Sequence, residues 1–342
     1  MQRRIPPVAA WLLACCALVF AMVVVGGMTR LTHSGLSIVE WQPLVGAIPP
    51  LTDAQWQETF GKYQQTPEFR LRNHDMTLAG FKAIFWWEYF HRLLGRVIGV
   101  VFLVPFLYFL ARRRIARHMA WPLAGIFLLG GLQGAVGWYM VKSGLVDDPR
   151  VSSIRLAMHL GLAFLIYAAM LWVALGLIAR APSPSDPATR RASASMAALV
   201  FVMVLTGALV AAIRAGYAYN TFPLKNGHLV PPEILMIEPW WENFIHNMAT
   251  VQLVHRVLAM VVLACAVLLW ARVRARTPAG TPARTWANAL GFFAVLQVCV
   301  GIATLVLRVP LPLAALHQSG AVVVFTCAVG LARVLRPASL QP

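Results

Sequence analysis

The fold is decided by the stretch EYFHRLLG at residues 88–95, which returns 164 residues later as QLVHRVLA at residues 252–259. A second motif follows each copy, because LQGAVG at residues 132–137 corresponds to LQVCVG at residues 296–301. The two motifs occur in the same order in both halves of the chain. Such ordered matches at a long interval indicate an internal duplication.

Each half carries two histidines within apolar segments: His91 and His159 in the first, His255 and His317 in the second. The residue four positions after each histidine is small, namely Gly95, Ala163, Ala259 and Ala321. Residues i and i+4 share a helix face, so each histidine overlooks a surface on which a planar group can lie. Two such pairs indicate two bis-histidine haem sites. The alternative is hydrogen bonding between closely packed helices, but the fourfold recurrence favours haem.

The composition is that of a membrane protein, since 59% of the 342 residues are hydrophobic and 12% are charged. Spans of about 20 apolar residues, enough to cross a bilayer, are predicted near 8–28, 90–111, 119–140, 154–179, 195–215, 248–271, 285–307 and 312–334. The first span resembles a signal peptide but is long and lacks a small-x-small cleavage site, so it is expected to be retained. We predict an all-α, polytopic membrane protein with eight transmembrane helices in two tandem, pseudo-twofold four-helix bundles.

Membrane topology explains the formal net charge of +17. The two terminal tails and the three loops that follow even-numbered spans hold 15 of the 29 basic residues and one acid, Asp186. Loops rich in arginine and lysine face the cytoplasm, so both termini are predicted to be cytoplasmic. This explanation argues against a nucleic-acid partner.

An even number of spans in each half makes the repeat parallel. Residues 1–185 are predicted to form the N-terminal half and residues 186–342 the C-terminal half, joined by a polar linker over 181–193. All four histidines are expected within about two turns of the outer ends of their helices, at a rise of ~1.5 Å per residue. Both haem sites are therefore predicted to open towards the extracytoplasmic face.

The outer loops of the two halves differ. The first is long, over residues 29–83, and is predicted to contain a short helix from Asp53 with a capping box formed by Thr52 and Gln55. The corresponding loop near 216–247 is aromatic and rich in proline. Loops of this kind can cover a binding site, although many serve only as connections.

The two copies of the repeat differ in charge at position 88, because Glu88 of the first half corresponds to Gln252 of the second. Glu88 precedes His91 by three residues and is expected on the same helix face. A carboxylate at that depth must be paired, protonated or hydrated. If the first site binds a substrate porphyrin, Glu88 can act as a base or stabilise developing positive charge. The alternative is a structural salt bridge with Arg92 at i+4.

Cationic side chains near the outer helix ends can bind haem carboxylates. The candidates are Arg92, Arg256, Arg96, Lys142, Arg150, Arg155 and Arg308. The alternative for each of them is that the charged group extends to the membrane interface. The other histidines, namely His33, His74, His118, His228 and His246, match no spacing typical of metal ligands.

Four motifs occur in order along essentially the whole chain. They are GGMTRLTHSGLS at 26–37, EYFHRLLGR at 88–96, AYNTFPL at 218–224, and His255-Arg256 followed by His317. This ordered set resembles the haem A synthase family of the proteobacterial and mitochondrial type. The resemblance implies that His255 and His317 hold a permanent haem b, and that His91 and His159 bracket the substrate haem O and the product haem A.

The resemblance also implies a reaction. The C8 methyl group of haem O is oxidised to a formyl group by successive hydroxylations, and the geminal diol then loses water. Glu88 matches the acidic catalytic position of the family. Some family members carry an extracytoplasmic cysteine pair that this sequence lacks, so an electron route through a thiol–disulfide pair is not expected here.

The family further implies a multi-pass protein of the bacterial inner membrane. Its implied partners are haem O synthase and the cytochrome c oxidase assembly machinery. Apart from the resemblance, the apolar spans predict contact with membrane lipid, and a second copy of the chain is a further candidate partner. The main alternative is a di-haem b-type electron carrier, quinone-linked and cytochrome b-like, in which neither haem is altered. Glu88 without a counterpart and the long first loop favour the enzyme. A transporter fits less well, because its binding histidines are expected near the midplane rather than near one face.

Overall fold

The computed structural model describes residues 5–42, 45–178, 183 and 185–336. Within these ranges, eight helices are long and apolar enough to cross a membrane. They are α1 (Pro7–Leu31), α4 (Leu78–Ala111), α5 (Arg117–Lys142), α6 (Ser153–Ile178), α7 (Pro187–Ala212), α9 (Met248–Arg276), α10 (Pro282–Val306) and α11 (Leu311–Val334). The predicted all-α fold with eight spans is confirmed, and the chain is a multi-pass membrane protein.

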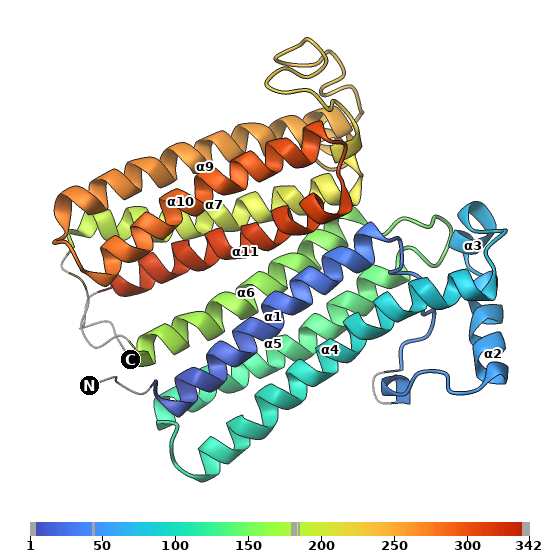
Figure 1. Cartoon of the computed structure of the whole chain (residues 1–342), viewed down its shortest axis with the longest axis horizontal. Helices are drawn as coiled ribbons and strands as arrows, with labels where there is room; N and C mark the ends of the chain where they lie inside the picture. Colours follow the sequence, from blue (N-terminus) through green and yellow to red (C-terminus); the bar gives the residue numbers. More distant parts are fainter. Residues whose placement is uncertain (1–4, 43–44, 179–182, 184, 337–342) are drawn as a thin grey trace.

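The long helices form two closed rings of four (Figure 1). In the first ring, α1 and α5 each contact both α4 and α6. In the second ring, α7 and α10 each contact both α9 and α11. Each ring therefore places two helices on a diagonal, α4 opposite α6 and α9 opposite α11. The division of the chain into two haem-binding units at residue 185 remains a prediction.

The two rings meet along a seam formed by α1 and α6 on one side and α7 and α11 on the other. One apolar core runs through both rings and across this seam. Polar contacts also cross it, since the hydroxyls of Tyr167 and Thr326 lie 2.7 Å apart. The amide nitrogen of Gln318 on α11 donates to the main-chain oxygen of Val23 on α1 over 2.7 Å.

Two helices begin earlier than the hydropathy pattern predicts. Helix α4 starts at Leu78 rather than near residue 90, because Thr77 caps it and its first turns pack in an aromatic cluster outside the apolar span. Helix α7 starts at Pro187 rather than near 195, because the Asp186 carboxylate accepts hydrogen bonds from the first main-chain amides of that helix. The second part of the predicted linker is therefore helical, and residues 181, 182 and 184 lie outside the described ranges.

The first outer loop folds into its own small layer against α4. It contains the 3-10 helix η1 (Val45–Ala47), then α2 (Asp53–Gln64) and α3 (Pro67–Arg72). The predicted capping box at the start of α2 is confirmed. Aromatic side chains of α2 and α4 hold the layer together, with Trp56 against Phe85 at a ring-centroid distance of 4.9 Å.

The second outer loop holds three shorter elements: η2 (Ala215–Tyr217), η3 (Trp240–Glu242) and α8 (Asn243–His246). Both outer loops project from the same end of the helices (Figure 1). The turns between α4 and α5 and between α9 and α10 lie at the opposite end, as do the start of α1 and the end of α11. The arginine-rich turns between α4 and α5 and between α9 and α10 are thus on one side of the molecule.

Candidate functional site

The four histidines of the repeat lie on the diagonal helices, His91 on α4 and His159 on α6, His255 on α9 and His317 on α11. His91 interacts electrostatically with His159, and His255 with His317. The fold therefore brings the two histidines of each half into electrostatic contact, and their pairing as haem ligands stays a prediction. His91 differs in one respect, since it lies thirteen residues after the start of α4 at Leu78. The expectation of two turns is wrong for His91 because α4 extends beyond the apolar span.

A glycine on a neighbouring helix contacts each histidine ring. Helix α1 meets α4 in this way, α5 meets α6, α7 meets α9, and α10 meets α11. A β-carbon placed on the glycine would lie 2.9 Å from Cε1 of His91 at Gly26, 2.8 Å from His159 at Gly137, 3.3 Å from His255 at Gly207 and 2.7 Å from His317 at Gly301. Close helix packing without a side chain therefore supports all four rings. The small residues expected from the sequence lie on the histidine's own helix, whereas these contacts come from neighbouring helices and were not predicted, although Gly137 and Gly301 stand in the repeated motif.

The repeated motif also supplies an equivalent glutamine to each half. The side-chain amide of Gln133 donates to the main-chain oxygen of His159 over 2.9 Å, and that of Gln297 donates to the main-chain oxygen of His317 over 2.7 Å. These bonds tie α5 to α6 and α10 to α11 at the level of the histidines. Both glutamines stand in the repeated motif, but their contacts with the histidines were not predicted from the sequence.

The two halves differ at the first histidine of each pair, which is His91 in the first half and His255 in the second. Thr206 Oγ1 donates to the main-chain oxygen of Met203 over 2.8 Å and lies 2.9 Å from Nδ1 of His255. Because its proton is already used, the hydroxyl accepts from Nδ1–H and leaves Nε2 as the basic nitrogen. Val25 occupies the equivalent position in the first half, and Nδ1 of His91 is buried without a partner among the described residues.

Glu88 is 2% exposed and fully engaged in hydrogen bonds. Its Oε2 accepts from the Ser37 hydroxyl and from the main-chain amide of Ile38, both at 2.8 Å. Its Oε1 accepts from Nε and Nη2 of Arg92 at 3.1 and 2.6 Å. The salt bridge considered from the sequence is thus present, and the carboxylate also holds the start of the first outer loop on α4.

The counterpart Gln252 is equally buried and performs a neutral version of the same task. Its amide nitrogen donates to the main-chain oxygens of Ala215 and Ala218, at 2.6 and 2.5 Å. Each half therefore fastens its outer loop to the residue three positions before the histidine. The residue at this position is charged in the first half, where it is Glu88, and neutral in the second half, where it is Gln252.

Arg92 and Arg256 follow their histidines and both donate to the outer loop. Nη2 of Arg92 binds the main-chain oxygen of Ile38, and Nη2 of Arg256 binds that of Tyr219, each at 2.7 Å. Arg92 uses its remaining groups on Glu88 and on the main-chain oxygen of Glu40. Nε and Nη1 of Arg256 are buried without a partner in the described part of the chain. Arg256 thus keeps free donors, whereas those of Arg92 are committed to the protein.

Most other cationic candidates also bind protein groups. Arg96 donates to the main-chain oxygen of Gln42, Arg155 to that of Tyr139, and Arg150 forms a salt bridge with Asp148. No group of three or more His, Cys, Asp or Glu residues gathers in the described ranges. A two-histidine site suits an iron whose other four ligands are porphyrin nitrogens, as in bis-histidine haem proteins.

Comparison with known proteins settles the family. The family model described as cytochrome oxidase assembly protein matches residues 9–329. A relative named Heme A synthase from Nitrosospira multiformis is 56% identical over 334 residues, which cover 96% of this chain and 94% of the relative. The chain belongs to the haem A synthase family. Proteins of the same name from Nitrosomonas eutropha and Rhodospirillum centenum are 51% and 52% identical, with 96% of this chain covered in both cases and 94% and 88% of the relatives.

Proposed function

We propose that this chain makes haem A by oxidising the C8 methyl group of haem O to a formyl group. The first half binds the substrate between His91 and His159, and the second half holds a resident haem b between His255 and His317. Family membership supports the overall activity. The observation that carries the division of labour is the Thr206 hydroxyl on His255, which has no equivalent at His91.

The residues of the second half fit a bound haem b. His255 and His317 would supply the two protein ligands of the iron, and the glycines beside them leave no side chain between ring and backbone. Nε and Nη1 of Arg256 are buried donors that haem carboxylates would satisfy. A bis-histidine haem b at this place would supply one-electron transfer.

A fixed imidazole suits a resident group, and an unfixed one suits a group that must leave. A hydrogen bond to Nδ1 orients the ring and raises the basicity of Nε2, and losing such support typically weakens metal binding about 10- to 100-fold. Thr206 gives this support to His255. His91 and His159 both have a buried Nδ1 without a described partner. This difference supports a weaker and exchangeable first site.

Glu88 is the group we propose to act on the substrate. It precedes His91 by one helical turn, and the Ser37 hydroxyl, the Ile38 amide and Arg92 hold its carboxylate in place. A carboxylate fixed in this way can take up a proton or stabilise cationic character as the methyl group is oxidised. The same bonds hold the start of the outer loop against α4 beside this carboxylate.

We further propose a bacterial inner-membrane location with both termini in the cytoplasm. The arginine-rich turns at one end of the helices support this orientation. The two histidine pairs then lie towards the outer half of the membrane. We propose haem O synthase as the donor of substrate and the cytochrome c oxidase assembly machinery as the recipient of product, and the family description, cytochrome oxidase assembly protein, supports the second partner.

The test is to express the chain in a host without its own enzyme and to extract and chromatograph the bound haems. A haem A synthase yields haem A, with haem O beside haem b in the purified protein. The di-haem electron carrier, in which neither haem is altered, yields haem b alone. Haem b alone, in a host that supplies haem O, would contradict the proposed reaction.

A further inference from the structure

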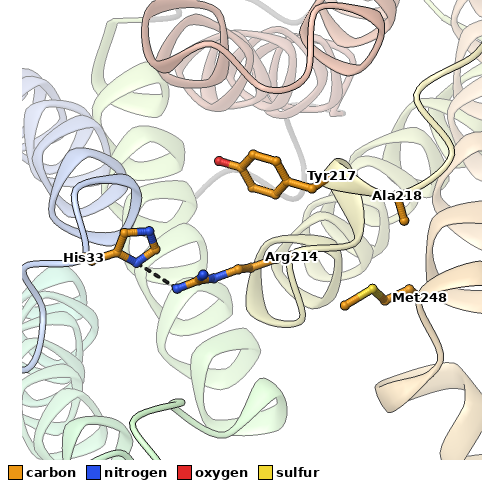
Figure 2. Close-up of a pocket in the computed structure, with 5 residues that line it drawn as sticks. All are labelled: His33, Arg214, Tyr217, Ala218 and Met248. Atoms are coloured by element: carbon orange, nitrogen blue, oxygen red, sulfur yellow. Dashed lines mark hydrogen bonds between the residues drawn. The ribbon is translucent and has the colours of Figure 1, made fainter. Parts of the chain in front are cut away.

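A pocket of about 560 Å³ opens at the seam between the two halves, at the end of the helices that carries the outer loops. His33 lines one side, and Arg214, Tyr217, Ala218 and Met248 line the other (Figure 2). Nη2 of Arg214 lies 2.8 Å from Nδ1 of His33 and donates to it across the seam. The pocket therefore joins the end of α1 to the end of α7.

His33 and Arg214 occupy equivalent places in the repeat. They are 181 residues apart, the interval that also separates Gly26 from Gly207. Both have a left-handed backbone, with φ of 56° and 57°. A left-handed conformation at a non-glycine residue is uncommon and directs the side chain away from the course of the preceding helix. A ligand in this pocket would touch matching positions of both halves.

Arg214 lines the pocket and belongs to a cluster of three arginines that interact electrostatically. Arg30, Arg72 and Arg214 repel one another, and none forms a salt bridge within the described ranges. Arg30 donates to the main-chain oxygens of Ala211 and Ala212 at the end of α7, while its Nε is buried without a described partner. This cationic cluster lies at the end opposite the arginine-rich turns.

The positive charge of these arginines affects the pKa values of His33 and Glu68. Burial and then the charges of Arg214, Arg30 and Arg72 lower the pKa of His33 to about 4, so this histidine is a neutral acceptor near pH 7. Glu68 interacts with Arg72 and Arg214, but burial raises its pKa to about 7. Glu68 is thus only partly ionised near neutral pH and compensates the arginines incompletely.

We propose that this seam pocket binds a phosphate group, held by Arg214, Arg30 and Arg72 between the two halves. Guanidinium groups pair with phosphate oxygens through charge-assisted hydrogen bonds, and several arginines around one anion favour phosphate. The pocket lies at the helix ends, the level of lipid head groups, and Tyr217 and Met248 give it an apolar wall. The source is the head group of an anionic phospholipid or free phosphate. This inference does not depend on the reaction proposed above.

Native mass spectrometry of the full chain, titrated with phosphatidylglycerol, phosphatidylcholine or inorganic phosphate, tests the proposal. Wild-type protein is expected to bind phosphatidylglycerol in preference to phosphatidylcholine if the source is lipid, or to bind inorganic phosphate if it is free phosphate. Arg214→Gln should weaken that binding by at least about tenfold, the effect of losing a charge-assisted hydrogen bond. Arg72→Gln should act in the same direction, and its exposed position at the end of α3 keeps the helix packing intact.

The matched control is Arg113→Gln, which changes an exposed arginine with the same left-handed backbone, φ 53°, in the turn between α4 and α5. Binding by this variant should equal that of the wild type. Equal losses in Arg113→Gln and Arg214→Gln would mean that lipid responds to overall charge, and they would overturn the proposal. So would unchanged binding in Arg72→Gln, which decides the matter if Arg214→Gln fails to fold. Absence of binding by every probe would also overturn it.

Discussion

At the scale of single residues, one hydroxyl distinguishes the two histidine sites. His91 and His255 sit at equivalent positions, and a glycine of the preceding helix contacts each ring. Thr206 accepts a hydrogen bond from His255, whereas the residue at the equivalent position of the first half is Val25, which has no hydroxyl group. A ligand histidine whose second nitrogen is held by the protein binds iron more firmly than one that is not. We therefore expect the second site to bind haem more tightly than the first.

We predict that Thr206→Val weakens haem b retention about 10- to 100-fold, the usual effect of removing a hydrogen bond behind a metal ligand. The change copies the first half and preserves the side-chain shape. The reciprocal variant Val25→Thr should increase retention of haem in the first site. Haem released to apo-myoglobin, followed by absorbance, measures both. Equal release rates for wild type and Thr206→Val would show that this hydroxyl does not decide residence.

Glu88 combines a structural bond with the proposed chemistry, and these can be separated. Glu88→Gln removes the charge but keeps the size, and Gln252 fills the same place in the second half. The variant should insert, keep haem b and lose haem A production by about 10²- to 10⁴-fold, as expected for a positioned acid–base group. Haem O or a hydroxylated intermediate should accumulate in extracted haem.

Ser37→Ala is the control for this prediction. It removes one hydrogen bond to the same carboxylate and leaves both the charge and the Arg92 salt bridge in place. Haem A production should fall far less than in Glu88→Gln. Comparable losses in the two variants would identify closure of the outer loop, rather than the charge, as the role of Glu88. Near-normal production by Glu88→Gln would leave the salt bridge as its whole function.

At the scale of helices, packing of glycine against histidine is what brings each pair into register. Gly137 on α5 contacts His159, so closely that a β-carbon there would lie 2.8 Å from the ring. Gly134, one turn earlier on the same helix, has nothing within 4 Å of such a carbon. Contacts below about 3 Å force the imidazole to move, and packed interiors accommodate such a change poorly.

We therefore predict that Gly137→Ala displaces His159 and abolishes haem A production while most haem b remains. Gly134→Ala adds the same methyl group to the same helix and should leave production unchanged. Haem chromatography of the two purified variants gives the comparison. Loss of haem b in Gly137→Ala would contradict the assignment of Gly137 to the first site. Full haem A production in that variant would show that the contact is dispensable.

Some features of the helices could be predicted from the sequence and others could not. Hydropathy predicted all eight spans, and the residue types at the start of α2 predicted its capping box, because each of these features depends on residues close together in the sequence. The start of α4 escaped prediction because aromatic side chains of α2, distant in sequence, stabilise its outer turns. The bonds from Glu88 to Ser37 and Ile38 escaped for the same reason. Contacts between helices require spatial neighbours that a single sequence does not give.

At the scale of the whole molecule, two rings built alike present both histidine pairs towards the end that carries the outer loops (Figure 1). Their orientation in the membrane is open to direct labelling. Single cysteines at exposed Asp53 and Asn226, in a background without native cysteines, should react with an impermeant maleimide from outside. Cysteines at exposed Arg114 and Arg276 should react only after the membrane is opened. The reverse pattern would place both haem sites at the cytoplasmic side.

The two histidine pairs are proposed to form bis-histidine sites with different tasks. Absorption spectra and extracted haems of four purified alanine variants distinguish these tasks. His255→Ala and His317→Ala should lose the low-spin haem b signal while the protein still inserts, because each supplies one of two axial ligands. His91→Ala and His159→Ala should keep most haem b and produce no haem A. A full bis-histidine spectrum in both His255→Ala and His317→Ala would contradict the account.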